Sequence, residues 1–241
     1  MPDTPASLAY YNDTKNASRY HSQTGFDPAR KQAMLQVTLR LLTDLAPAGA
    51  RLLELGCGSG LFTAMPAATG RFSSICATDG AGAMLEIARP LFASAPTPVV
   101  FETLDFTQSD WAGQYPPASF DAVTSSMALH HAEDKQRLFR QVFAVLAPGG
   151  AFVFADHMAG SSASIDRLID QERAWVKLGP EPLTEDMESF IQNDRQKQTA
   201  QGNHCESVAD YLGYLQAAGF AGVDCLWRSY WLAVFVAQKP G

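Results

Sequence analysis

Three glycines occupy alternate positions directly after a short apolar run. In LLELGCGSG, residues 52–60, they are Gly56, Gly58 and Gly60. Glycine adopts positive φ and lets another group approach the backbone closely. A strand that ends in such a turn and opens into a helix suits a nucleotide-like ligand. A tight turn also needs glycine for structural reasons, so the neighbouring strands decide the interpretation.

Polar groups follow the next two strands that the sequence predicts. Asp79 ends the second strand, nineteen residues after Gly60, where a carboxylate can accept both hydroxyls of a ribose. Asp105 and Phe106 follow the third strand and offer an acceptor beside an apolar face, which suits an adenine amino group and ring. Because ligands of an open parallel sheet bind outside the carboxyl ends of its strands, these groups are expected to converge.

Two further strands end in side chains that can bind a substrate or exchange a proton. After the fourth strand these are Ser125, Ser126, His130 and His131, and after the fifth they are Asp156 and His157. A histidine here is a candidate general base, or it caps the next helix or binds a backbone carbonyl. Of the two adjacent histidines we favour His130 as the base. Asp156 and His157 are candidates to face the substrate.

A sheet of parallel strands would bring these groups together, and the pattern of the chain predicts one. We expect strands at 51–55, 74–79, 98–103, 120–126 and 150–156, alternating with helices at 61–68, 83–91 and 134–146. Asp27 followed by Pro28 starts an earlier helix, with Asp as its cap and Pro at its first position. Short apolar strands alternating with helices predict a parallel α/β sheet covered on both faces.

The segment after the fifth strand departs from this alternation. It contains two helical patterns and no strand, with Ser162 or Ser164 and then Thr184 as candidate caps. Apolar residues such as Trp175 recur at helical spacing there, which is more typical of a core than of a pocket. An insertion above the sheet edge must cover something, however, so we expect a few of them, with Arg195, to face a substrate.

The two ends of the chain complete the division into parts. Residues 1–25 show no clear period, and we expect an irregular segment there. A last helix near 207–218 precedes strands near 222–229 and 231–237, which fit an antiparallel hairpin. We therefore divide the chain into an N-terminal lid or mobile segment (1–27), a ligand-binding core (28–156), a helical insertion that covers the substrate (157–206), and a last helix and hairpin that complete the core (207–241).

These motifs together resemble those of the class I S-adenosylmethionine-dependent methyltransferases. LLELGCGSG is similar to motif I of that family, ATDGAGAML to its acidic second-strand motif, and Asp105-Phe106 to its adenine-side motif. FDAVTSSMALHH and LAPGGAFVFAD resemble its fourth- and fifth-strand signatures, and AAGF with WLAVFVAQKP its ending. The resemblance implies a Rossmann-like, doubly wound sheet of seven strands in the order 3-2-1-4-5-7-6, with strand 7 antiparallel. It also implies S-adenosyl-L-methionine as cofactor and S-adenosyl-L-homocysteine as product.

The resemblance further implies which residues surround the cofactor. Ala17-Ser18-Arg19-Tyr20 is similar to an A-x-x-Y motif whose tyrosine lies against the cofactor in many relatives. The full expected set is Tyr20, Glu54, Gly56, Cys57, Gly58, Gly60, Asp79, Gly80, Met84, Asp105, Phe106, Ser125 and Ser126.

We expect transfer of a methyl group to an oxygen or nitrogen atom of a small molecule by in-line displacement. Holding the reactants at near-attack distance can supply up to ~7–11 kcal/mol of the barrier. A hydroxyl acceptor also benefits from a general base, typically worth ~10²–10⁴-fold in rate. Amine and carboxylate acceptors can react without one, so a catalytic side chain is not required.

Composition and charge exclude several other classes of function. The net charge of −7 and the absence of a Lys/Arg run give no general attraction to nucleic acid. No apolar run approaches the ~20 residues that cross a membrane. The four cysteines lack metal-type spacing, so we expect no metal site, reduced thiols and a cytoplasmic setting. We expect a monomer or a homodimer.

Three alternatives remain open. The insertion and the ending slightly resemble the carboxy-S-adenosylmethionine synthase branch, which needs a basic residue for a carboxylate, here Arg195 or Lys197. An NAD(P)-dependent oxidoreductase would carry G-x-G-x-x-G, whereas Leu61 follows Gly60 in this chain. A third alternative is a non-catalytic protein that binds S-adenosylmethionine. We rank ordinary methyl transfer above all three.

Overall fold

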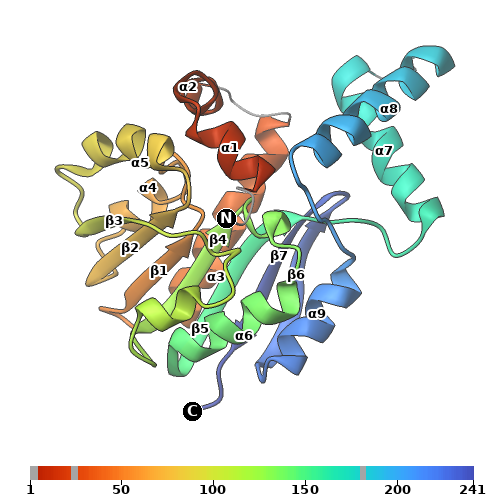
Figure 1. Ribbon diagram of the computed structural model, residues 1–241. Coiled ribbons are helices and arrows are strands. Elements are labelled where there is room, and N and C mark those ends of the chain that lie inside the picture. The colour runs from red at the N-terminus through yellow and green to blue at the C-terminus, as the bar shows by residue number, and fades with distance from the viewer. Residues whose placement is uncertain (1–4, 23–26, 180–182) are drawn as a thin grey trace.

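The computed structural model describes residues 5–22, 27–179 and 183–241. At its centre lies a seven-stranded sheet in the order β3-β2-β1-β4-β5-β7-β6 (Figure 1). The strands are β1 (Arg51–Leu55), β2 (Ser74–Asp79), β3 (Val99–Thr103), β4 (Phe120–Ser126), β5 (Leu146–His157), β6 (Ala221–Ser229) and β7 (Leu232–Gln238). β1 to β5 pair in parallel, and β7 runs antiparallel to both β5 and β6. The predicted strand order and the terminal hairpin are confirmed.

Helices cover both faces of the sheet, because its central strands are apolar on both sides. Phe152 and Phe154 of β5 belong to a core with α6 (Lys135–Val145) and α9 (Val208–Ala217). Val153 and Ala155 point the other way, into a core with α3 (Pro28–Leu45), α4 (Ala64–Ala68) and α5 (Gly82–Ala88). Figure 1 shows α6 and α9 in front of the sheet and α3 behind it. Residues buried on both faces explain why these strands read as continuous apolar runs.

Side-chain caps fix several helix starts. The Asp27 carboxylate accepts the backbone N–H of Arg30 at 3.1 Å, as expected for the start of α3. Ser207 and Asp210 form a reciprocal capping box at the start of α9. Two expectations were wrong in detail. α4 begins at Ala64 rather than near residue 61, and Thr184 is the first residue of its helix rather than the cap.

The expectation of irregular structure before residue 25 is wrong for the part that the structure describes. Residues Ala6–Asn12 form α1 and Thr14–Ser22 form α2. Ala17 is fully buried in a small cluster with Ala81 and Met84, against which Tyr11 and Tyr20 also pack. The sequence hid these helices because their buried positions are small or polar-tipped residues rather than an aliphatic stripe.

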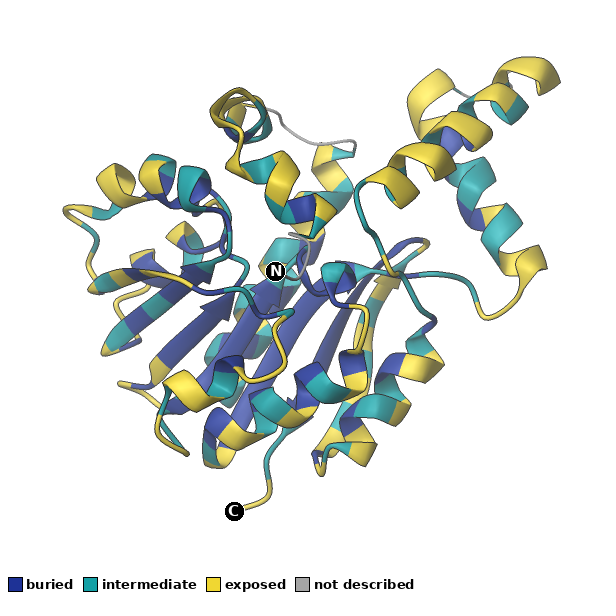
Figure 2. Ribbon diagram, in the orientation of Figure 1, coloured by how far each residue is buried: buried dark blue, intermediate teal, exposed yellow. Residues whose placement is uncertain are grey.

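The insertion after β5 forms a pair of packed helices, α7 (Ala163–Leu178) and α8 (Thr184–Ala200), and Ser162 caps the first. Ion pairs join them: Arg167 with Glu188, Arg195 with Asp170, and Arg173 with Asp194. Figure 2 shows this pair projecting from the sheet with much of its surface exposed. Among the described residues, no helix combines the length and apolarity that a bilayer span requires.

Short 3₁₀ turns lie between the main elements: η1 (Arg89–Phe92), η2 (Trp111–Gln114) and η3 (Leu129–His131). All four cysteines are free thiols.

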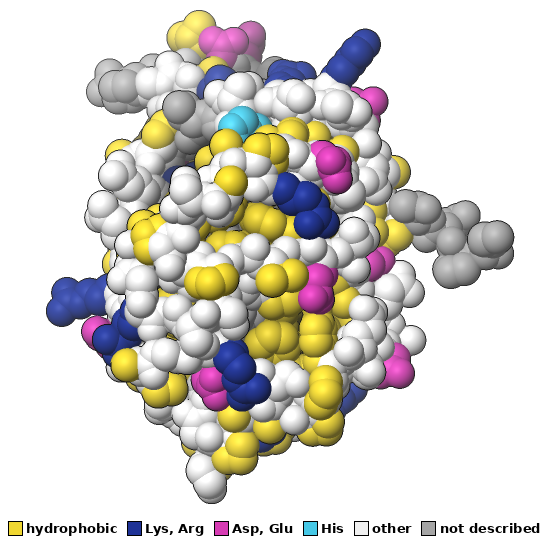
Figure 3. Space-filling model, turned by 90° about the vertical axis from the view of Figure 1, so that its left-hand side faces the viewer, with side chains coloured by type: hydrophobic (Ala, Val, Ile, Leu, Met, Phe, Trp, Pro, Cys, Tyr) yellow, Lys and Arg dark blue, Asp and Glu magenta, His cyan; other side chains and the backbone are white. Residues whose placement is uncertain are grey.

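On the face seen from the β3 edge, Lys and Arg side chains lie scattered among Asp and Glu (Figure 3).

Candidate functional site

The glycine turn after β1 is tied to the end of β2. The Gly58 N–H donates to Asp79 Oδ2 at 2.8 Å, and the Ala81 N–H donates to Asp79 Oδ1 at 2.8 Å. The Cys57 N–H donates to the Thr78 carbonyl at 2.8 Å. These bonds hold the Asp79 carboxylate beside the turn. Each of its oxygens accepts one bond from the protein and keeps a further lone pair for a ligand.

Two glycines of this turn have different roles. Gly56 has φ +69°, and a Cβ there would stand 2.3 Å from the Ala128 Cβ, so close packing excludes a side chain. Gly58 has φ +54°, but the nearest atom to a Cβ there belongs to Tyr20, at 3.9 Å. Gly58 therefore leaves open space in front of the backbone, where a ligand can approach.

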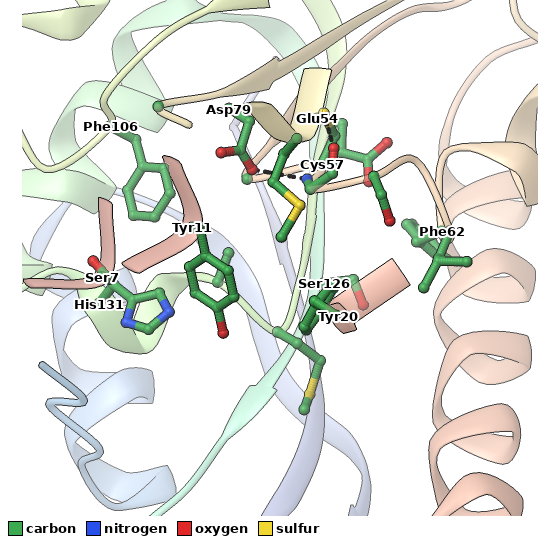
Figure 4. Close-up of a pocket in the computed structure, with 18 of the residues that line it drawn as sticks. Ser7, Tyr11, Tyr20, Glu54, Cys57, Phe62, Asp79, Phe106, Ser126 and His131 are labelled. Atoms are coloured by element: carbon green, nitrogen blue, oxygen red, sulfur yellow. Dashed lines mark hydrogen bonds between the residues drawn. The ribbon is translucent and has the colours of Figure 1, made fainter. Parts of the chain in front are cut away.

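That open space belongs to a cavity at the carboxyl edge of the sheet. Figure 4 shows residues of β1, β2 and the N-terminal helices facing this space. Of the residues predicted around a cofactor, it is lined by Tyr20, Glu54, Gly56, Cys57, Gly58, Asp79, Gly80, Met84, Asp105, Phe106 and Ser126.

Gly60 and Ser125, also predicted for this set, lie behind the cavity wall. A Cβ at Gly60 would stand 2.7 Å from the Phe92 ring, so this glycine serves packing. The Ser125 hydroxyl donates to the Leu55 carbonyl at 2.7 Å and joins β4 to the end of β1. Both residues shape the turn rather than face the cavity.

Asp105 and Phe106 form one wall of the cavity. Asp105 Oδ1 accepts the Thr107 N–H at 2.9 Å, and Oδ2 accepts the Gln108 side-chain amide at 2.7 Å. These local bonds fix the turn after β3 and leave a lone pair on Oδ2. The buried Phe106 ring adds an apolar surface beside it.

Glu54 places a buried carboxyl in the same cavity. Its Oε2 is buried and makes no hydrogen bond of normal geometry among the described residues, although the unpaired Thr63 hydroxyl lies nearby. Burial, with the nearby Asp79 charge, raises the pKa of Glu54 to about 7. An unpaired buried polar atom is costly, so this oxygen is suited to meet a donor on a bound ligand.

The N-terminal helices close the cavity from above. Ser7, Leu8 and Tyr11 of α1 line it together with Tyr20 of α2. The Tyr11 and Tyr20 rings meet edge to face at 5.5 Å (Figure 4). The sequence indicated a lid or mobile segment here and gave motif support to Tyr20 alone. The lining residues Ser7 and Leu8 carried no motif.

The two adjacent histidines face different surroundings. His131 lines the cavity, and its ring centre lies 6.3 Å from that of Tyr11. Its Nδ1 is buried without a partner among the described residues, so its bond with the Gly202 backbone involves the other ring nitrogen. Burial, together with the neighbouring His130, lowers the pKa of His131 to about 3. The ring is therefore neutral at neutral pH and keeps a free lone pair.

His130, the residue favoured from the sequence, lies beneath this wall and not in it. It is 4% exposed, and its Nδ1 lies 2.5 Å from Asp156 Oδ1. The Tyr211 hydroxyl donates to Asp156 Oδ2 at 3.2 Å. Asp156 is completely buried, so both residues belong to an internal polar network instead of facing a substrate.

The remaining candidates lie farther along the sheet edge. His157 and Arg195 line neighbouring hollows between β5, α7 and α8, with Arg195 bound to Asp170. His157 stacks on His130 at a ring distance of 4.8 Å. Trp175 lies half-exposed on α7 and contributes to none of these walls.

Comparison with known proteins gives three kinds of match. The profile of a family described as "Methyltransferase domain" matches residues 53–154. The chain is 30% identical over 211 residues to 27-O-demethylrifamycin SV methyltransferase of Amycolatopsis mediterranei, covering 77% of this chain and 75% of that one. It is 33% identical over 108 residues to a ubiquinone biosynthesis O-methyltransferase of Xanthomonas axonopodis, covering 44% and 42% respectively.

Among solved structures, similarity extends over the whole chain. Phospholethanolamine N-methyltransferase 2 of Haemonchus contortus, in complex with phosphomonomethylethanolamine and S-adenosylhomocysteine, aligns with 100% of this chain and 62% of its own. The TM-score is 0.70 at 14% identity. The two proteins share this fold.

Proposed function

The chain belongs to the class I S-adenosylmethionine-dependent methyltransferases, and on that basis we propose that it methylates an oxygen or nitrogen atom of a small molecule. One observation carries the proposal. A single cavity is lined by the glycine turn, the Asp79 carboxylate, the Phe106 ring and the neutral ring of His131. An acceptor beside His131 would lie next to the space in which the cofactor binds.

The residues that line the cavity fit the cofactor. Asp79 keeps lone pairs for the ribose hydroxyls, and Glu54 Oε2 is buried without a partner among the described residues. Asp105 and Phe106 offer an acceptor and an apolar face to the adenine. Gly58 leaves its side of the turn open. When bound, S-adenosylmethionine supplies a methyl group on a positively charged sulfur.

His131 is the residue that we assign to the acceptor. Its Nδ1 has no partner among the described residues, and the Gly202 backbone lies beside the ring. In the tautomer that carries its proton on the other nitrogen, Nδ1 accepts a hydrogen bond from an acceptor hydroxyl and orients its oxygen. A pKa of about 3 makes the ring a weak base in the free protein, so we assign to His131 the positioning of the hydroxyl and the receipt of its proton only as the oxygen attacks. Leu8 and Tyr11 of α1 cover the space and limit the entry of water.

The curated relatives favour oxygen over nitrogen as the atom methylated. The names of both relatives specify an O-methyl group, on a rifamycin in one case and in ubiquinone biosynthesis in the other. A general base is of most use to a hydroxyl acceptor, which agrees with the placement of His131.

Membership of the methyltransferase family removes the oxidoreductase alternative. The structure gives less support to the other two functions. A carboxy-S-adenosylmethionine synthase would need a free basic residue in the insertion; Arg195 is bound by Asp170, which leaves the exposed Lys197 as the candidate. A non-catalytic binding protein would have no need of an unpaired His131 nitrogen in the cavity wall. Both remain alternatives that turnover would decide.

The experiment is to incubate the protein with methyl-labelled S-adenosylmethionine and a set of phenols, hydroxy acids and amines, and to measure labelled product and S-adenosylhomocysteine. We expect turnover with at least one acceptor, reduced by about 10²–10⁴-fold in His131→Ala if the acceptor is a hydroxyl. A protein that binds the cofactor but transfers its methyl group to none of these acceptors would favour the non-catalytic alternative.

A further inference from the structure

A second cavity adjoins the first on the side away from β3. It lies between α2, α3, α8 and the end of β5. Tyr11, Tyr20, Lys31 and Met127 line both cavities and so form the wall between them. A molecule in the second cavity would reach the first past these four side chains.

Both carboxylates of the second cavity have cationic partners. Asp27 lies 3.3 Å from the Arg30 guanidinium, which it shares with Glu172. Asp194 accepts from Arg173 at 2.9 Å and also from the Gln198 amide at 2.7 Å.

Lys31, in contrast, has no carboxylate partner among the residues that the structure describes. Its ammonium lies 5.8 Å from the centre of the Tyr20 ring. Burial lowers the pKa of this lysine. Arg19 and Lys197 add two exposed cations at the edge of the same cavity. This collection of positive charge stands out in a chain whose net charge is −7.

Two buried acceptors in the cavity wall also lack partners within the described parts of the chain. They are Nδ1 of His157 and Oδ1 of Asn203. Burial is the main cause that lowers the pKa of His157 well below its ordinary value, and nearby groups that include Arg173 and Lys31 add to it. Arg173 is paired with Asp194, so Lys31 is the neighbouring cation that is left to meet an anion.

The other walls of the cavity are apolar and largely aromatic. Tyr10, Tyr11, Tyr20, Trp231 and Leu232 contribute to them. Such walls bind an apolar or aromatic body, whereas Lys31 stands at the junction with the first cavity.

We propose that the methyl acceptor is an organic anion whose apolar body lies against these aromatic walls of the second cavity, whose carboxylate or phosphate lies against Lys31 at the junction, and whose nucleophilic atom enters the first cavity beside His131. This inference rests on the proposed function. It adds the class of acceptor, which the fold alone does not indicate.

The test uses the full chain saturated with S-adenosylhomocysteine and titrated in a calorimeter with 4-hydroxybenzoate, phenyl phosphate and the neutral 4-hydroxybenzamide. A charge-assisted contact is worth ~1.5–3 kcal/mol, so at least one anion should bind about tenfold or more tightly than the amide. Lys31→Gln should remove that preference. The matched control Lys177→Gln changes an exposed lysine of α7 outside the cavity and should leave it intact.

Equal binding of the anions and the amide, no binding of either anion, or an unchanged preference in Lys31→Gln would overturn the inference. A titration with S-adenosylhomocysteine alone distinguishes a role of Lys31 in cofactor binding from a failure of the proposed function. Strong loss of its binding in Lys31→Gln, with the fold intact by circular dichroism, would assign Lys31 to the cofactor's carboxylate and overturn the acceptor assignment. Failure of the unmodified chain to bind S-adenosylhomocysteine would instead contradict the proposed function. Arg19→Gln, an exposed change, provides a second variant if Lys31→Gln does not fold, and it should weaken anion binding in the same direction.

Discussion

The Gly58 N–H donates to Asp79 Oδ2 at 2.8 Å, so the turn after β1 and the carboxylate at the end of β2 are one unit. This bond positions Asp79 before any ligand arrives. It also places the carboxylate next to the open side of Gly58. The predictions below concern Gly58 of this turn, the buried Glu54, the pair of His130 and Asp156, and His131 in the cavity wall.

Gly58→Ala should weaken cofactor binding as well as stability. The left-handed φ of +54° costs a non-glycine residue about 1–2 kcal/mol. The added methyl would also project toward the open space of the cavity. Gly49→Ala is the matched control, because Gly49 has φ +76° and nothing within 4 Å of a Cβ. Chemical denaturation should show a similar decrease in the free energy of unfolding in both variants. Calorimetry should show weaker S-adenosylhomocysteine binding only in Gly58→Ala. Equal affinities in the two variants would contradict this role of Gly58.

Glu54→Gln should stabilise the ligand-free protein at high pH. The folded-state pKa of about 7 lies above the ordinary 4.5, so the folded protein holds the proton more tightly than the unfolded chain. The stabilisation that this proton gives to the folded state is complete below about pH 4.5 and is lost as the pH rises through about 7. The glutamine variant mimics the protonated carboxyl, and its gain at pH 8 should reach about 3 kcal/mol. Urea unfolding of the variant and the unmodified protein at pH 5 and pH 8 measures the difference in their free energies of unfolding. A difference that is the same at both pH values would show that the charge of Glu54 is not responsible.

Asp156→Ala should be strongly destabilising. It leaves the His130 ring and the Tyr211 hydroxyl without their buried acceptor, and each buried polar group left without a partner typically costs about 1–3 kcal/mol. Tyr211→Phe removes only the hydroxyl that donates to Asp156 and should cost about 1 kcal/mol. Unfolding curves of the two variants compare these losses. A loss below 1 kcal/mol in Asp156→Ala would mean that the network is not structural.

His131 should remain neutral over the physiological range. Its pKa of about 3 lies below the ordinary 6.5, so the unfolded chain binds this proton more readily than the folded protein. The stability associated with His131 is complete above about pH 6.5 and declines as the pH falls toward 3. Its imidazole resonances in an NMR titration should show no protonation between pH 8 and pH 5. Protonation with a midpoint near 6.5 would show that the ring is open to solvent.

Patterns along the chain predicted the sheet but not all of the site. β1 is recognisable because it is largely buried and leads into the glycine turn, and the motifs that follow β2 and β3 located Asp79 and Phe106. α1 and α2 were missed because Ser7 and Ala17 occupy their buried positions. Tertiary contacts, rather than local pattern, make these segments helical.

The choice between His130 and His131 also lay outside the reach of the sequence. The two residues are adjacent in η3 and identical in type, so only their contacts distinguish them. His130 turns toward Asp156, a residue 26 positions away, and this leaves His131 to face the cavity. The second cavity was likewise hidden, because α2, α3 and α8 contribute to it from distant parts of the chain.

The measurement that tests the account most directly is calorimetric titration of the chain with S-adenosylmethionine and S-adenosylhomocysteine, beside Asp79→Ala. Asp44→Ala, an exposed carboxylate on α3, is the matched control. We predict micromolar binding of both ligands by the unmodified chain and the control. Because two charge-assisted bonds to ribose would be lost, binding should be about a hundredfold weaker in Asp79→Ala that remains folded. Absence of binding by the unmodified chain, or unchanged affinity in Asp79→Ala, would contradict the claim that this cavity holds the cofactor.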